Sequence, residues 1–138
     1  MRVIVMSRKD AVRYSFGPHE EETAVVSIST PFQQYGAGIY KSRYNGIHSI
    51  LRLEFDDVDC GEEAITEFDA MRIKGYVEAN KEKTIIIHCD AGVSRSAGIA
   101  AALMKHYNGD DSEIFDNPRY VPNMLCYRIM LNVLEGIE

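Results

Sequence analysis

Residues 84–104 read TIIIHCDAGVSRSAGIAAALM, and this stretch decides the fold. The β-branched run Thr84–Ile87 is typical of a buried strand, and the small apolar run Ala97–Met104 is typical of a buried helix. Between them, His88–Ser96 is rich in small and polar side chains. A loop that joins a buried strand to a helix N-terminus directs backbone N–H groups at one point, and we therefore expect it to hold an anion.

The loop also carries side chains that suit chemistry on an anion. Cys89 opens it, and the field that favours an anion also stabilises a thiolate. Arg95 follows six positions later and offers a planar fork of donors to phosphate oxygens. A lone cysteine is usually a small buried hydrophobe, but that interpretation leaves Gly92 and the hydroxyls of Ser94 and Ser96 unexplained. We keep it for Cys126, which lies within a helical pattern.

Outside this stretch, the patterned segments alternate between the two kinds of secondary structure. The predicted strands are Val3–Met6, Ala24–Ile28 and Ser49–Phe55, and the predicted helices run from Glu62 to Asn80, from Arg95 to about Tyr107, and over an amphipathic stripe of Leu125, Ile129 and Val133. Residues 33–45 are expected to be a loop or a short helix.

The helix from Glu62 is expected to take its cap from Asp59 or Gly61. Its apolar stripe is predicted to comprise Ala64, Phe68 and Met71.

The alternation predicts an α/β fold, with residues 1–138 forming one domain around a central, mainly parallel sheet of four to five strands flanked by helices. The sequence has 138 residues, of which 46% are hydrophobic and 26% charged, as in a globular domain with its own core. The net charge of −6 argues against a nucleic-acid partner, and no apolar run reaches the length of a membrane span. Three cysteines without paired spacing favour a reducing cytoplasm. No metal or cofactor is expected.

The string His88–Ser96 matches the Cys-x5-Arg signature of the protein tyrosine phosphatase superfamily, and it most resembles the loop of the small dual-specificity phosphatases. The resemblance extends from about Ile50 to Leu134, with a strand, an acidic loop and a helix upstream, and Pro122-Asn123 opening a helix downstream. It implies the cysteine-phosphatase fold and the hydrolysis of phosphate monoesters, with phosphotyrosine on proteins, phosphoserine or phosphothreonine, or a small phosphate monoester as substrate.

The resemblance also assigns roles to residues of the loop. Cys89 would attack phosphorus and form a cysteinyl-phosphate, Ser96 would hydrogen-bond the thiolate, and His88 would orient the loop from behind. The phosphate would be held by the loop residues Asp90, Ala91, Gly92, Val93, Ser94 and Arg95. Asp90 is expected at the mouth of the site, where an acidic group would repel very anionic substrates.

The leaving oxygen needs a proton, and the family supplies it from an aspartate about thirty residues before the cysteine. The candidates are Asp56, Asp57 and Asp59, of which Asp57, 32 residues upstream of Cys89, fits the spacing best. The choice among the three remains open on sequence alone. Cys60 lies nearby and is expected to be an unpaired thiol rather than a disulfide partner of oxidised Cys89.

Two other function classes stay open beside an active phosphatase. A phosphate-binding pseudophosphatase would keep the loop but lack a competent acid. A rhodanese-like or arsenate-reductase-like thiol enzyme would use the same cysteine for different chemistry. The sequence does not specify the physiological substrate or the oligomeric state.

Overall fold

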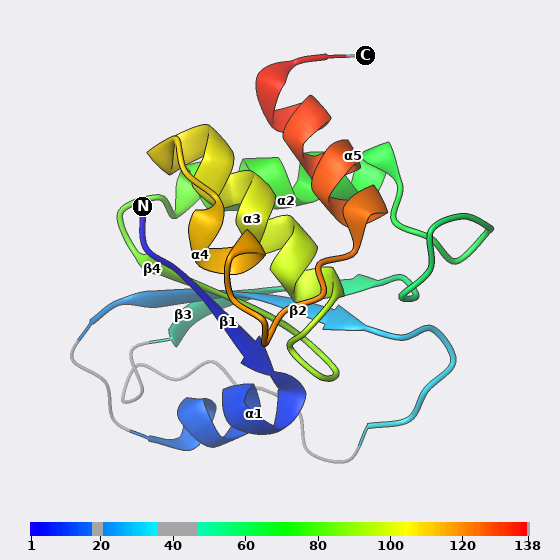
Figure 1. Ribbon diagram of the computed structural model, residues 1–138. Helices are drawn as coiled ribbons and strands as arrows, with labels where there is room; N and C mark the ends of the chain where they lie inside the picture. Colours follow the sequence, from blue (N-terminus) through cyan, green and yellow to red (C-terminus); the bar gives the residue numbers. More distant parts are fainter. Residues whose placement is uncertain (18–20, 36–46, 138) are drawn as a thin grey trace.

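A computed structural model describes residues 1–17, 21–35 and 47–137 of the chain. Figure 1 shows its helices and strands. In chain order they are β1 (Val3–Ser7), α1 (Arg8–Phe16), β2 (Thr23–Ser29), β3 (Ile47–Glu54), α2 (Glu67–Ala79), β4 (Thr84–Cys89), α3 (Arg95–Asn108), α4 (Ser112–Phe115) and α5 (Met124–Glu135). Of the segment predicted as loop or short helix, residues 36–45 lie outside the described residues.

The strands form a four-stranded sheet in the order β1-β4-β2-β3, and every neighbouring pair is parallel. The predicted α/β architecture with a mainly parallel central sheet is therefore confirmed. In a parallel sheet all strands finish at the same edge. Ser7 at the end of β1 pairs with Cys89 at the end of β4, and Ser29 at the end of β2 pairs with Glu54 of β3. This edge brings distant parts of the chain together.

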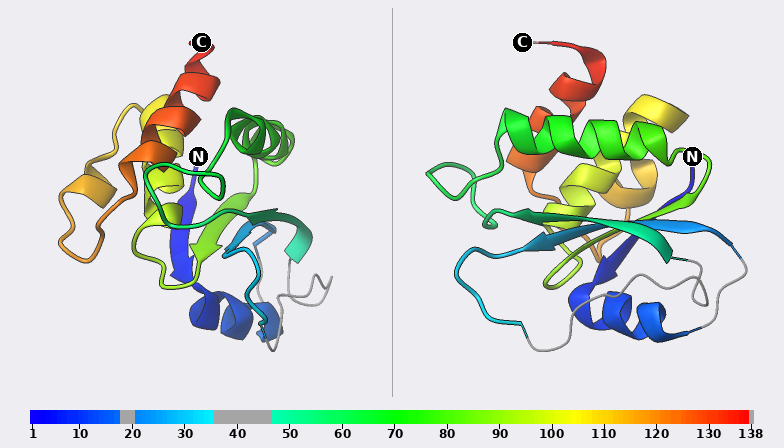
Figure 2. Two further views of the ribbon diagram at one scale, coloured as in Figure 1. Left: turned by 90° about the vertical axis from the view of Figure 1, so that its right-hand side faces the viewer. Right: turned by 180° about the vertical axis from the view of Figure 1, so that it is seen from behind.

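Helices cover both faces of the sheet (Figure 2). On one face, α2 and α3 pack on the strands and α5 packs against these two helices, while α1 lies on the other face. Side chains alternate between the faces, as the two-residue period of a strand requires. Val25 and Ile86 pack with Ala11 of α1, whereas Val26 and Ile87 belong to the large core beneath α3. Both faces of the central strands are buried, which explains their continuous β-branched sequence.

Two details of the predicted helices are wrong. Helix α2 begins at Glu67, and its cap is Thr66, whose hydroxyl accepts a hydrogen bond from the backbone N–H of Asp69 while the Asp69 carboxylate accepts from the N–H of Thr66. This reciprocal pair is a capping box, which satisfies two backbone N–H donors. It favours a helix that begins at Glu67 over the predicted start at Glu62. Phe68 and Met71 face solvent, with exposed fractions of 68% and 60%, because α2 packs through its opposite face. The buried stripe is instead Ala70, Ile73 and Val77.

Helix α1 was not predicted at all. The final helix was predicted, but its most buried residues are Cys126, Met130 and Leu134, each one position after the predicted stripe. The predicted stripe is only half-buried, because α5 packs against both α3 and α2 and needs a wide apolar face. Cys126 is buried as expected, and burial, followed by the negative charge of Asp57, raises its pKa to about 12. In the described part of the chain, no helix is long and apolar enough to span a bilayer.

Candidate active site

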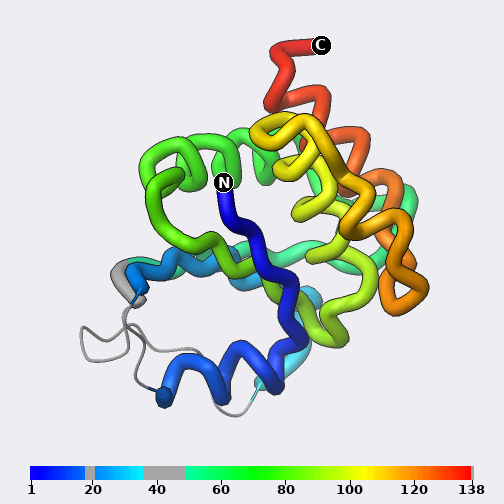
Figure 3. The backbone as a smooth tube through the Cα atoms, turned by 60° about the vertical axis from the view of Figure 1, so that its left-hand side comes forward, coloured from blue at the N-terminus to red at the C-terminus, as the bar shows by residue number. Residues whose placement is uncertain are grey.

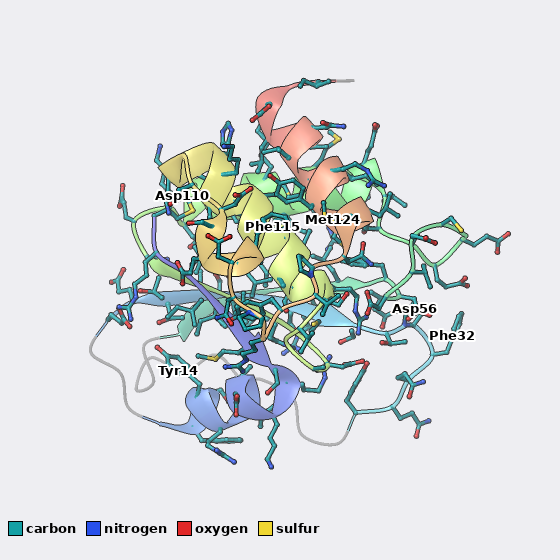
Figure 4. All side chains as sticks on the ribbon, in the orientation of Figure 1. Tyr14, Phe32, Asp56, Asp110, Phe115 and Met124 are labelled. Carbon is teal, nitrogen blue, oxygen red and sulfur yellow. The ribbon has the colours of Figure 1, made fainter. Side chains whose placement is uncertain are left out.

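The loop between β4 and α3 lies at the edge where the strands finish, beside the end of β1 (Figure 3). Two other segments reach this edge. The turn after β2 carries Phe32 and the loop after β3 carries Asp56, and both labelled side chains project at this end of the sheet (Figure 4). A crevice outside the carboxyl ends of parallel strands is where open α/β folds bind ligands.

Gly92 allows the loop to pass close to β1. Its φ of +69° lies in the left-handed region, where a side chain is strained. A Cβ at this position would lie 2.6 Å from the backbone nitrogen of Ser7 and 2.7 Å from the carbonyl carbon of Met6. Only glycine therefore fits the loop in this shape.

The nucleophile candidate Cys89 is buried, with 2% of its surface exposed. Its sulfur lies 3.1 Å from the hydroxyl oxygen of Ser96, on the first turn of α3. Burial by itself raises the pKa of the thiol, but hydrogen bonds from the Ser96 hydroxyl and from the backbone N–H groups of Ser96 and Gly92, together with the charge of Arg95, outweigh it and lower the pKa. The setting is thus one that favours a thiolate.

Arg95 is nearly buried, with 4% of its surface exposed. One terminal nitrogen, Nη1, donates to the backbone oxygen of Phe55 at 2.7 Å. The other, Nη2, donates to a carboxylate oxygen of Asp90 at 3.1 Å. The guanidinium is therefore clamped between the end of β3 and the loop that it closes.

Asp90 is in contact with two arginines. Its other carboxylate oxygen accepts a hydrogen bond from Nε of Arg8 at 3.3 Å, and the hydroxyls of Thr30 and Tyr35 donate to the same oxygen as Arg95, at 2.8 and 3.2 Å. Partial burial raises the pKa of Asp90. The hydroxyl donors and Arg95 have a larger, opposite effect, so the pKa is lowered overall. The acidic group expected at the mouth of the site is paired with the guanidinium groups of Arg8 and Arg95.

Asp57 contacts the loop across 37 residues of sequence. Its carboxylate oxygen accepts hydrogen bonds from the hydroxyl of Ser94 at 2.8 Å and from the side-chain amide of Asn123 at 2.9 Å. Asp56 instead turns back on its own segment, where its carboxylate accepts from the N–H of Asp57 at 2.7 Å. Asp59 is exposed. Among the three candidates, Asp57 is the one whose side chain hydrogen-bonds to the loop in the described part of the chain.

His88 lies behind the loop and is fully buried. Its Nε2 is 2.7 Å from the hydroxyl of Ser27 on β2, and its Nδ1 is 3.2 Å from the backbone oxygen of Cys89. Burial lowers its pKa to about 4, so the ring is neutral at pH 7. A neutral ring held from both sides suits a supporting position rather than a base.

Sequence reasoning missed Arg8 and Asn123, and also Thr30 and Tyr35, which donate to Asp90. Arg8 follows Ser7, which caps α1 by accepting from the N–H of Asp10, so the Ser-x-x-Asp pattern was the available signal. Asn123 caps α5 with its side-chain oxygen and donates to Asp57 with its side-chain nitrogen. Pro122-Asn123 is typical of the opening of a helix, but nothing in the local sequence indicates the contact with Asp57.

Two further observations concern the cysteines and the metal-ligating side chain types. Cys60 is a free and exposed thiol, as is consistent with an unpaired cysteine. Within residues 1–17, 21–35 and 47–137, no three His, Cys, Asp or Glu side chains gather in a way that suits a metal ion.

Comparisons with known proteins give a result only at the level of structure. No family model matches the sequence, and no curated protein matches it either. Among solved structures, the chain is similar to PTPMT1 in complex with PI(5)P, with a TM-score of 0.64, 14% identity and coverage of 98% of this chain and 91% of that one.

Two human proteins are similar over comparable lengths. DUSP28 gives a TM-score of 0.61 at 18% identity, covering 97% of this chain and 92% of that one. The tyrosine phosphatase-like serine/threonine/tyrosine-interacting protein gives 0.62 at 16% identity, covering 97% and 89%. The chain therefore has the fold of the protein tyrosine phosphatase superfamily in its dual-specificity form.

Proposed function

We propose that this protein is a cysteine-dependent phosphatase that hydrolyses phosphotyrosine, and also phosphoserine and phosphothreonine, on proteins. The observation that carries the proposal is the meeting of two segments at one point. Cys89 and Arg95 stand on a loop between a buried strand and a helix, and Asp57 contacts the same loop through Ser94 at 2.8 Å. A nucleophile, an anion clamp and an acid are the three components that phosphate-ester hydrolysis through a covalent intermediate requires.

In the first step, the Cys89 thiolate attacks phosphorus and an S–P bond forms. The P–O bond to the leaving group breaks, and Asp57 gives its proton to the departing oxygen. In the second step, water attacks the cysteinyl-phosphate while Asp57 takes a proton from it, and the S–P bond breaks to release phosphate and the thiolate. Ser96, 3.1 Å from the sulfur, stabilises the thiolate as it departs.

Arg95 and the backbone N–H groups of the loop stabilise the negative charge of the transferred phosphoryl group. The transferred phosphoryl group spreads negative charge over its equatorial oxygens, so positioned donors contribute most of the rate. Arg95 is already held by Phe55 and Asp90 before any substrate is bound. A lysine at this position would lose both the planar fork and these anchors. The thiol must stay reduced for this chemistry, and we therefore propose that the protein works in the cytoplasm.

The proposal is tested by phosphate release from phenyl phosphate and from a phosphotyrosyl peptide. Cys89→Ser is expected to abolish release. Asp57→Asn is expected to slow it about 10²- to 10³-fold, and more for phenyl phosphate than for 4-nitrophenyl phosphate, whose leaving group needs no proton. Asp59→Asn is the matched control and should retain the wild-type rate.

The other outcomes separate the rival functions. A wild type that binds orthovanadate yet releases no phosphate would favour the pseudophosphatase. Release of thiocyanate from thiosulfate and cyanide, or of arsenite from arsenate, in place of phosphate would overturn the proposal in favour of another thiol enzyme.

A further inference from the structure

The carboxylate of Asp90 joins three separate parts of the fold. It accepts hydrogen bonds from Arg95 at the start of α3, from Arg8 at the start of α1, and from Thr30 and Tyr35 in the turn after β2. These segments are far apart in sequence and meet because α1 and the turn both begin at the carboxyl edge of the sheet. Two of the four contacts are ion pairs.

The contact with Arg95 determines how that guanidinium is presented. Its side chain is 5% exposed, whereas that of Asp90 is 40% exposed, so the pair lies at the boundary between core and solvent. Within the described residues, Arg95 uses one donor on Phe55 and one on Asp90, which leaves three of its five N–H donors for a ligand. A long side chain that is fixed in advance loses less conformational entropy when an oxyanion arrives.

The remaining contacts hold Asp90 itself. The hydroxyl of Tyr35 accepts a hydrogen bond from the backbone N–H of Thr30 at 2.9 Å, which closes the turn. The Arg8 guanidinium stacks on the Tyr35 ring at 3.7 Å and also donates to the Ser29 hydroxyl at 2.8 Å. Because two positive charges face one carboxylate, the cluster keeps a net positive charge beside the loop.

We propose that Asp90 is a positioning residue, which holds the Arg95 guanidinium in place for the transferred phosphoryl group and is itself held by Arg8 and the Thr30–Tyr35 turn. This inference rests on the proposed phosphatase function. It assigns to Asp90 an effect on the transition state through Arg95 rather than a direct contact with substrate.

Asp90→Asn tests the proposal, because it keeps the shape of the side chain and removes its charge. We expect kcat for phenyl phosphate to fall about tenfold and KM to change less, since a hydrogen bond between charged groups is weakened. Tyr35→Phe removes one donor to Asp90 and keeps the ring beneath Arg8, and it should lower kcat about twofold. Glu54→Gln, an exposed carboxylate at the same edge, is the control and should leave kcat unchanged.

A double-mutant cycle separates positioning from a structural role. Orthovanadate affinity is measured for wild type, Asp90→Asn, Arg95→Ala and the double variant, with urea midpoints recorded for all four. If Asp90 acts through Arg95, the loss of orthovanadate affinity caused by Asp90→Asn should shrink to less than twofold in the Arg95→Ala background. Equal losses in both backgrounds would overturn the proposal, as would a wild type that does not bind vanadate. A wild type that binds vanadate but hydrolyses nothing would refute the phosphatase function. The cycle would then still test whether Asp90 acts on the bound oxyanion through Arg95.

Discussion

Gly92→Ala is the substitution whose effect follows most directly from the geometry. The added methyl carbon would lie 2.6 Å from the nitrogen of Ser7 and 2.7 and 2.8 Å from the carbonyl carbon and oxygen of Met6, where ordinary contact begins at 3.4 Å. Either the loop or β1 must therefore move by about 0.6–0.8 Å. Strand β1 resists this movement because its register with β4 runs from Val3 to Ser7.

The cost has two parts that can be estimated. Overpacking of this kind costs about 1–3 kcal/mol, and an alanine at a φ of +69° adds about 1–2 kcal/mol. A total of about 2–5 kcal/mol is a large share of the stability of an ordinary domain, so the variant should fold with a clearly lower urea midpoint. If the loop rather than the strand gives way, its amide donors are displaced, and phosphatase turnover should fall about 10²-fold.

The control is the same substitution at Gly75, in the middle of α2, where a Cβ meets nothing within 4 Å. There alanine should stabilise the protein by up to about 1 kcal/mol through helix propensity. Urea denaturation and turnover of 4-nitrophenyl phosphate are measured for both variants. The reasoning is refuted if Gly92→Ala keeps the wild-type midpoint and rate.

Three further substitutions test the site and the core. Ser96→Ala removes the hydroxyl 3.1 Å from the Cys89 sulfur, so the thiol pKa should rise and the pH profile of iodoacetamide alkylation should move to higher pH. Asn123→Ser keeps a capping oxygen for α5 but loses the amide that donates to Asp57. Its urea midpoint should change little, while turnover of phenyl phosphate falls about fivefold. Burial lowers the pKa of His88 to about 4. Below pH 6.5, His88 is therefore protonated in the unfolded chain but stays neutral in the folded protein. Stability should therefore fall by about 2 kcal/mol from this residue between pH 7 and pH 5, and His88→Gln should reduce the fall measured by urea denaturation.

Each of these expectations has a contrary result. An unchanged alkylation profile would show that Ser96 does not stabilise the thiolate. Equal turnover of phenyl phosphate by Asn123→Ser and wild type would show that Asp57 needs no support from α5. An undiminished loss of stability in His88→Gln would assign the acid sensitivity to carboxylates.

The segment from Thr84 to Asn108 was predicted almost to the residue, because each of its signals is local. The β-branched run, the glycine and the small apolar helix each fix their own conformation. Helix α1 was missed because Arg8–Phe16 is mostly polar, and its start depends on the cap at Ser7. The predicted start of α2 is too early because residues 62–66 contain helix-forming residues, whereas the helix begins at Glu67.

In the site too, contacts between residues close in sequence were predictable, whereas contacts between distant segments were not. The relation of Cys89 to Ser96 follows from their places at the two ends of one short loop. The partners of Asp90 come from α1 and from the turn after β2, and the partner of Asp57 comes from α5. Arg95 lies in the same loop as Asp90, but nothing in the sequence around Asp90 indicates that Arg8 also pairs with it.

The pairing of β1 with β4 also bears on the order in which the protein folds. Ser7 and Cys89 are register partners although 82 residues separate them. Strand β1 is synthesised before β4, which is its partner in the sheet that the structure describes, so this pairing forms only after β4 has been made. Gly92 reaches its final conformation only against the backbone of Met6 and Ser7. We therefore expect docking of β1 and completion of the loop between β4 and α3 to be coupled during folding.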